Sequence, residues 1–301
     1  MRELAFPVPQ EYDGIRMKNF LRGYCGLSAR LLVKLKRQPM GITNNGLHAI
    51  ATDILQAGDT VRIFMPDDEK QPEPVSLPLS VVFEDQDVLV VNKPADMPMY
   101  PTPGHDRDSL ANAAAAYYLG RDQKIAFRPV YRLDKDTSGL VLLAKNPFAA
   151  ACLSGSVGKE YFAVCEGELC GCGEIDKPIG LKEGHRIQRE VNPGGEKALT
   201  KWKSLCVSRN HSFLVLELET GRTHQIRVHL SHIGHPLAGD DMYGGSLGYI
   251  ARQALHCGKI RFLHPVTKQN LEFVCRLPED MEKLLDVCHM ESVQNHIIEP
   301  A

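Results

Sequence analysis

The chain has 301 residues, of which 43% are hydrophobic and 24% are charged, and its formal net charge is -2. This composition predicts a globular, soluble chain with one large and one small domain, and no apolar run is long enough to cross a bilayer. The nine cysteines are scattered without a paired framework, and the N-terminus has no signal-peptide core, so we expect reduced thiols and a cytoplasmic location.

Residues 1–65 are predicted to form a small module of their own. Helical periodicity runs from residue 27 to residue 36, with Ser28 as a plausible cap. The Asn-Gly pair at 45–46 favours a tight hairpin, and residues 55–63 have the pattern of a turn that leads into a closing strand.

The first module concentrates positive charge, although the chain as a whole does not. Between residues 14 and 37 there are seven cations and no acid. They are Arg16, Lys18, Arg22, Arg30, Lys34, Lys36 and Arg37. A local patch of this kind can neutralise phosphates whatever the net charge, although a solvated helix face would have the same composition. Five of these residues are predicted to contact RNA: Arg16, Lys18, Lys34, Lys36 and Arg37.

The module is followed by an acidic, proline-rich segment and then by alternating strands and helices. Residues 66–79 fit either a linker stiffened by proline or an ordered surface loop. From residue 80 to residue 290 we expect one domain, which begins with two strands around an acidic turn at 81–94 and continues with an alanine-rich helix at 109–119. Further strands at 161–165 and 213–218 and a helix at 223–233 predict an α+β fold with a large, mostly antiparallel sheet. Residues 291–301 are predicted to be a tail.

The stretch 129–140 carries the strongest chemical signal. Arg132 and Asp134 stand one residue apart in a polar turn, and an apolar run at 140–144 follows. This pattern predicts a carboxylate at the edge of a buried strand with a cation beside it. Such a group can stay ionised and act as a nucleophile or a base.

This stretch resembles the signature His-Arg-Leu-Asp-x-x-Thr-Ser-Gly-Leu of the RluA-type pseudouridine synthases, enzymes that isomerise uridine within RNA. The chain departs from it at Tyr131, where the family has histidine. Segments 159–167, 221–230 and 252–265 resemble other family segments in the family's order, so that the resemblance covers about residues 80 to 278. The first module resembles the RNA-binding module shared with the small-subunit ribosomal protein S-four.

The resemblance implies roles for five residues. Asp134 would be the catalytic carboxylate, which either attacks the nucleotide or abstracts a ribose proton, and Arg222 would be the cation that pairs with it. Tyr161 would stack on the uracil, and Arg132 would fill the gap that the flipped base leaves. Tyr131 is flat and polar-tipped like histidine and would serve in its place.

The implied reaction needs no redox change and no outside atom, so no cofactor or metal is expected. The implied substrate is structured RNA, with large-subunit ribosomal RNA ahead of transfer RNA. No obligatory protein partner is evident. The target uridine, the number of sites and the oligomeric state stay open.

Three other functions compete with this interpretation. A zinc-dependent hydrolase would use a cluster of histidines and acids, although a His-Glu-x-x-His pattern is missing. That cluster comprises His224, His229, His232, His235, Asp240 and Asp241. A glycosidase would use Asp134 and Asp136 on one face of a strand, but the single tryptophan argues against a sugar cleft. A non-catalytic RNA-binding protein could keep the same fold.

Overall fold

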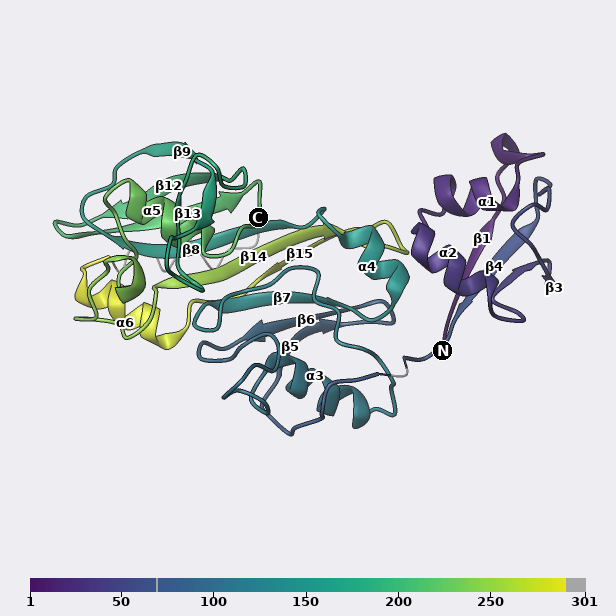
Figure 1. Cartoon of the computed structure of the whole chain (residues 1–301), viewed down its shortest axis with the longest axis horizontal. Helices are drawn as coiled ribbons and strands as arrows, with labels where there is room; N and C mark the ends of the chain where they lie inside the picture. Colours follow the sequence, from purple (N-terminus) through teal and green to yellow (C-terminus); the bar gives the residue numbers. More distant parts are fainter. Residues whose placement is uncertain (69, 291–301) are drawn as a thin grey trace.

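The computed structural model describes residues 1–68 and 70–290, which form a small N-terminal module beside a larger domain (Figure 1). The tail predicted at 291–301 lies outside the described residues. The module contains a four-stranded sheet in the order β1-β4-β2-β3, in which all neighbouring strands are antiparallel. Its strands are β1 (Arg2–Pro7), β2 (Ile42–Asn44), β3 (Leu47–His48) and β4 (Thr60–Met65).

Helix α2 (Ala29–Lys36) confirms the helix and the cap predicted from the sequence. The Ser28 side chain accepts a hydrogen bond from the backbone N–H of Leu31 at 3.2 Å, which satisfies one free donor of the first turn. Leu31 and Leu35 are buried against the sheet, so the cations of the same helix face outward. The module's other helical segments are η1 (Gln10–Tyr12), α1 (Met17–Asn19) and η2 (Phe20–Tyr24).

The hairpin between β2 and β3 is also confirmed. Asn45 and Gly46 both have positive φ angles, of 49° and 84°. Two consecutive left-handed residues are what a type I′ turn requires, and asparagine and glycine are the residues that adopt that conformation most easily.

The N-terminal module packs directly on the larger domain. Phe148, from helix α4 (Pro147–Leu153), is 1% exposed and belongs to the module's own hydrophobic core, where its ring meets the edge of Phe6 at 6.0 Å. Arg2 of β1 makes a two-pronged ion pair with Asp87, at 2.9 and 2.7 Å. The module is therefore anchored to the larger domain by apolar and ionic contacts together.

The proline-rich segment 66–79 contains no helix or strand among its described residues, but it is bound to the larger domain. Asp68 accepts a hydrogen bond from the backbone N–H of Ala126 at 2.9 Å and pairs with Arg128. The Asn112 side chain donates to the carbonyl of Glu73 at 2.8 Å. These contacts favour an ordered surface loop over a linker stiffened by proline.

The larger domain is built on a nine-stranded sheet, which confirms the α+β fold with a mostly antiparallel sheet (Figure 1). The order is β5-β6-β7-β14-β8-β13-β12-β9, with β15 paired to β14, and only β7 and β14 run parallel among the described strands. The strands are β5 (Ser80–Glu84), β6 (Val88–Lys93), β7 (Ser138–Ala144), β8 (Gly158–Glu166), β9 (Cys172–Asp176), β12 (Leu199–Val207), β13 (His211–Leu218), β14 (Leu255–Leu263) and β15 (Asn270–Val274).

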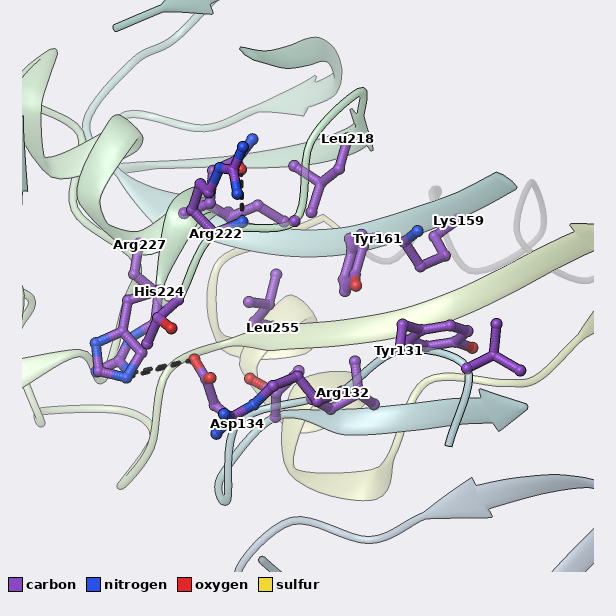
Figure 2. A pocket seen from close by; sticks show the side chains of 17 residues that line it. Tyr131, Arg132, Asp134, Lys159, Tyr161, Leu218, Arg222, His224, Arg227 and Leu255 are labelled. Carbon is purple, nitrogen blue, oxygen red and sulfur yellow. Dashed lines mark hydrogen bonds and ion pairs between the residues drawn. The ribbon is translucent and has the colours of Figure 1, made fainter. Parts of the chain in front are cut away.

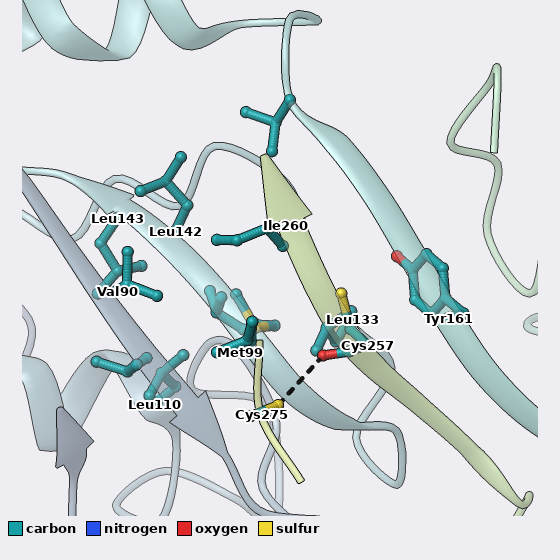
Figure 3. Packing of buried hydrophobic residues seen from close by; sticks show 14 of the residues in the cluster. Val90, Met99, Leu110, Leu133, Leu142, Leu143, Tyr161, Cys257, Ile260 and Cys275 are labelled. Atoms are coloured by element: carbon teal, nitrogen blue, oxygen red, sulfur yellow. Dashed lines mark hydrogen bonds between the residues drawn. The ribbon is translucent and has the colours of Figure 1, made fainter. Parts of the chain in front are cut away.

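The core of this domain lies around the central strands. Every residue of β7 is buried, as the apolar run at 140–144 predicts for most of the strand. Figure 3 shows Val90, Leu142 and Leu143 packed with Leu110 of helix α3 (Leu110–Leu119) and with Ile260. This packing makes the centre of the sheet a rigid support for the loops at its edge.

Smaller elements complete the domain at the end away from the N-terminal module (Figure 1). They are the hairpin of β10 (Ile179–Leu181) and β11 (Arg189–Val191), helix α5 (Gln225–His232), the short turn η3 (Asp241–Tyr243) and helix α6 (Glu279–Val287). Within the described ranges, no helix combines the length and the apolar content that a membrane crossing requires.

Candidate active site

A cavity of about 280 Å³ opens between the loop at 130–137, strand β8 and the start of α5 (Figure 2). Residues from four separate stretches of the sequence converge on it, around 130–137, 159–161 and 218–227 and at Leu255. The polar and aromatic residues of its lining include Tyr131, Arg132, Asp134, Lys159, Tyr161, Arg222, His224 and Arg227. All five residues to which the family resemblance assigned roles in the chemistry therefore line one cavity.

Hydrogen bonds from the buried Lys93 hold the loop that carries Asp134 in place. The Lys93 ammonium is fully buried and donates hydrogen bonds to the carbonyls of Pro94, Met97 and Lys135, at 2.8 to 2.9 Å. Since Lys135 directly follows Asp134, these bonds tie the loop to the end of β6. Burial lowers the pKa of Lys93 to about 7, an effect that the nearby Asp136 opposes.

Gly139 fixes the other end of the same loop. Its φ of 118° is a left-handed value, and a Cβ atom there would lie 2.3 Å from the carbonyl oxygen of Cys257. Only glycine therefore allows β7 to pair in parallel with β14 at this point. The Asp134 loop is thus held between two strands of the sheet.

Within the part of the chain that the structure describes, two side chains lie next to the Asp134 carboxylate, and both are near the same oxygen. Nη1 of Arg227 lies 3.5 Å from Oδ2, and Nε2 of His224 lies 3.8 Å from it. Arg227 is itself held by a two-pronged ion pair with the buried Asp240, at 2.7 Å for each contact. Because Nε and Nη2 are held by this pair, Nη1 is the nitrogen left to face Asp134.

Arg222 has a different partner from the one expected. Its side chain pairs with Glu196 at 2.6 Å, donates to the carbonyl of Lys197 at 3.0 Å, and is 39% exposed. Figure 2 shows it on the opposite side of the cavity from Asp134. The start of helix α5 explains this difference in partner. Because α5 begins only at Gln225, Arg222 lies in the turn before the helix, whereas Arg227 lies on the buried face of the helix. The cation beside Asp134 is Arg227.

Tyr161 lies in β8 and is only 5% exposed (Figure 3). Burial raises its pKa well above the usual value, and the neighbouring Cys257 and Asp134 act in the same direction. The side chain is therefore a neutral phenol at physiological pH. Its position offers the cavity a flat surface with one polar atom.

Tyr131 and Arg132 are neighbours in sequence with different environments. The Tyr131 hydroxyl donates to the carbonyl of Leu140 at 2.9 Å, and the ammonium of Lys159 lies 5.1 Å from the centre of its ring. Arg132 is exposed at the rim of the cavity. Tyr131 is therefore anchored in the wall, while Arg132 is free to meet a ligand.

Three of the four histidines considered as zinc ligands, His224, His229 and His235, are engaged with the protein instead. His229 contacts Thr200 Oγ1 and the carbonyl of Lys177, at 2.8 and 2.9 Å, and His235 contacts the carbonyl of Glu166 at 2.9 Å. Within residues 1–68 and 70–290, one group of donor atoms is close enough to share a metal, and it lies away from the cavity. That group is Asp85, Asp87 and His264.

The structure also lacks the geometry that the glycosidase hypothesis assumed for Asp134 and Asp136. Asp134 and Asp136 lie in a turn rather than on a strand, and the backbone N–H of Thr137 closes that turn on the carbonyl of Asp134 at 3.1 Å. The two carboxylates are therefore not presented on one face of a strand, which that mechanism would require.

The five cations predicted to contact RNA lie on the outer surface of the N-terminal module. All five are exposed, and none of them forms an ion pair with a described carboxylate. They are Arg16, Lys18, Lys34, Lys36 and Arg37. We refer to them below as the basic patch.

Comparison with known proteins identifies the family. The family described as RNA pseudouridylate synthase matches residues 87–232. The RNA pseudouridine synthase YjbO of Bacillus subtilis, whose function is uncharacterised, is 40% identical over 87% of this chain and 96% of its own length. The ribosomal large subunit pseudouridine synthase D of Haemophilus influenzae is 33% identical over 95% of this chain and 90% of its own.

A solved structure supports the same assignment. Human RNA pseudouridylate synthase domain containing 1 is 28% identical, with a TM-score of 0.57 over 73% of this chain and 90% of its own. The zinc hydrolase, the glycosidase and the non-catalytic RNA-binding protein are not favoured by any of these matches. The chain belongs to the RluA-type family of RNA pseudouridine synthases, as its motifs predicted.

Proposed function

We propose that this enzyme converts uridine to pseudouridine in large-subunit ribosomal RNA, in the cytoplasm, with Asp134 as the catalytic carboxylate. The observation that carries the proposal is the cavity in which Asp134, Arg227 and Tyr161 meet. The ribosomal substrate is supported by relatives named for the large ribosomal subunit, which are 33% and 38% identical to this chain. Transfer RNA is the second candidate substrate.

Each group in the cavity suits one requirement of the reaction. The bond between the base and the ribose must break, the uracil must turn while it is held, and a carbon must rejoin the sugar. Asp134 would react with the nucleotide, and Arg227 would supply a fixed positive charge beside the reacting group. Tyr161 would hold the loose uracil by stacking, since its buried ring forms part of the wall.

The target uridine must leave its stack before it can enter the cavity, at a cost of a few kcal/mol. Arg132 at the rim is the residue proposed to occupy the vacated place in the RNA. Its guanidinium is planar and can stack on the neighbouring bases. Tyr131, being anchored to Leu140, is proposed to shape the wall rather than to enter the RNA.

The basic patch is proposed to position the RNA through its phosphates. Contacts to phosphates orient a nucleic acid without reading its sequence. Since Phe148 and the ion pair of Arg2 with Asp87 anchor the module, the patch would hold the RNA at a fixed place relative to the cavity. The N-terminal module at 1–65 would then act as an RNA-binding module of the S-four type.

Tritium release tests the reaction and the substrate together. Ribosomal and transfer RNA carrying tritium at the uracil C5 position are prepared from cells that lack this gene and are incubated separately with the enzyme. The new carbon–carbon bond must expel the tritium, so we expect release from the ribosomal fraction. Release from transfer RNA alone would replace the proposed substrate, and release from neither fraction would contradict the activity on mature RNA.

Charge reversal in the basic patch is expected to weaken RNA binding. Replacing Lys34, Lys36 and Arg37 by glutamate should lower the affinity and reduce the salt dependence of log Kd, by about one unit of slope for each phosphate that is no longer neutralised. Titrations of labelled RNA between low and moderate salt measure both quantities. Lys283→Glu is the control, because Lys283 lies on α6 at the far end of the molecule. An unchanged affinity in the triple variant would remove the patch from RNA recognition.

A further inference from the structure

A series of hydrogen-bonding groups connects the backbone of β11 with the Asp134 carboxylate. The backbone N–H of Arg189 donates to the hydroxyl oxygen of Tyr243 at 2.9 Å. That oxygen lies 2.8 Å from Nδ1 of His224. On the other side of the same imidazole, Nε2 lies 3.8 Å from Oδ2 of Asp134 (Figure 2).

The two ends of this series of groups favour one direction of donation, since the backbone amide at one end can only donate and the Asp134 carboxylate at the other can only accept. An amide N–H can only donate, so it occupies a lone pair of the Tyr243 oxygen. The single proton of the Tyr243 hydroxyl is then free to be donated to Nδ1 of His224. A neutral imidazole that accepts at Nδ1 carries its proton on Nε2, and Nε2 is the atom that faces Asp134.

The charges around His224 also favour the neutral ring. Burial lowers its pKa, and the cations Arg227 and Arg189 act in the same direction, whereas Asp134 and Asp240 oppose them. A neutral ring allows only one proton on the two nitrogens. A proton on Nε2 allows both contacts at once, because Nδ1 then accepts from Tyr243 while Nε2 donates toward Asp134.

The backbone conformation of His224 directs its side chain toward this contact and not toward the free N–H groups at the start of α5. His224 has a φ of 58° and a ψ of 22°, a left-handed conformation that is uncommon outside glycine. It occupies the N-cap position of α5, yet its side chain makes no capping hydrogen bond. The imidazole is turned instead into the cavity wall, where it is 8% exposed. Backbone strain of this kind persists where the surrounding structure imposes it, most often at functional sites.

We propose that His224 is a positioning residue for Asp134, that its Nε2–H group holds Oδ2, and that Tyr243 fixes the required tautomer. The inference rests on the proposed catalytic role of Asp134. Arg227 contacts the same oxygen, so both contacts from the described residues involve Oδ2. The other carboxylate oxygen, Oδ1, would then be available to react with the nucleotide. The proposal requires the distance of 3.8 Å to shorten when substrate binds, as contacts in unliganded active sites often do.

Two substitutions of His224 separate this role from a structural one. His224→Gln places an amide nitrogen near the position of Nε2, whereas His224→Asn places it near Nδ1. Asparagine tolerates the left-handed conformation better than glutamine does, so a purely structural role predicts that the asparagine variant is the more active one. We expect the opposite order: His224→Gln keeps more of kcat, His224→Asn loses on the order of tenfold or more, and KM for RNA changes little in both.

Tyr243→Phe tests the tautomer directly. Phenylalanine keeps the ring on which the Arg227 guanidinium lies at 4.9 Å, so the pocket keeps its packing. The imidazole ¹⁵N chemical shifts of His224 are measured in protein labelled at histidine, with His224→Gln providing the assignment. We expect a protonated Nε2 in the unaltered enzyme and a mixture of tautomers with a lower kcat in Tyr243→Phe.

The outcomes that would overturn the inference are separate from those that bear on Asp134. A proton on Nδ1 in the unaltered enzyme would refute the assigned tautomer. A higher kcat for His224→Asn than for His224→Gln, or an unchanged kcat in Tyr243→Phe, would refute the positioning role. Full turnover by Asp134→Asn would instead refute the proposed function itself, whatever His224 does.

Discussion

Replacement of Asp134 by asparagine is expected to lower turnover by at least about 10³-fold while RNA binds with nearly unchanged affinity. Asparagine has the same shape but cannot serve as a nucleophile or a base. The fold should tolerate it, because the loop is held by the bonds from Lys93 to backbone carbonyls and by the backbone turn at Thr137. Single-turnover tritium release and RNA titration measure the two quantities on the same preparation.

Asp136 provides the matched control for this experiment. It lies two residues further along in the same turn, and its backbone carbonyl, not its side chain, accepts from Arg252 at 3.0 Å. Asp136→Asn removes one charge from the same loop and is expected to keep most of the turnover. Equal losses in the two variants would show that the charge of the loop matters rather than the chemistry of Asp134. Loss of RNA binding in Asp134→Asn would mean that this residue is structural.

The part of the site that is formed by residues close together in the sequence could be predicted from the sequence. Arg132 and Asp134 lie in one short motif, and the apolar run after it became the fully buried strand β7. The short signals for local structure were also reliable, as the Ser28 cap and the Asn45-Gly46 turn show. These features are decided by residues a few positions apart, so the sequence contains the information needed to predict them.

The sequence was less informative where a side chain's direction depends on the exact start of a helix. Arg222 and Arg227 lie five residues apart, and the predicted helix began at residue 223, two residues before the observed start at Gln225. One signal was available, since Arg227 is flanked by Ile226 and Val228 and an arginine between apolar residues is more often buried with a partner. That partner, Asp240, could not be identified without the fold.

Contacts between distant segments were outside the reach of sequence patterns. Phe148 lies on a helix of the larger domain but completes the core of the N-terminal module, and its apolar character alone does not show which core it joins. The parallel pairing of β7 with β14 depends on Gly139, whose missing side chain matters only because Cys257 lies against it. Both features result from tertiary packing, which short sequence patterns do not reveal.

Replacement of Arg227 by glutamine is expected to remove turnover and to destabilise the fold. The substitution leaves the buried Asp240 without its ion-pair partner, and breaking a buried pair in this way costs about 3–5 kcal/mol of unfolding free energy. Loss of the charge beside Asp134 should lower turnover by about 10²-fold or more. Chemical denaturation and single-turnover tritium release measure the two effects.

The double variant Arg227→Gln with Asp240→Asn separates stability from catalysis. A neutral amide pair replaces the ion pair, so most of the stability should return, whereas turnover should stay low because the positive charge is still missing. Arg222→Gln is the comparison, because its pair with Glu196 is exposed and contributes only about 0–1 kcal/mol. If Arg222→Gln abolishes turnover and the double variant retains it, Arg222 is the activating cation and reaches Asp134 only when RNA is bound. If the double variant is stable and inactive, the charge that the reaction needs comes from Arg227.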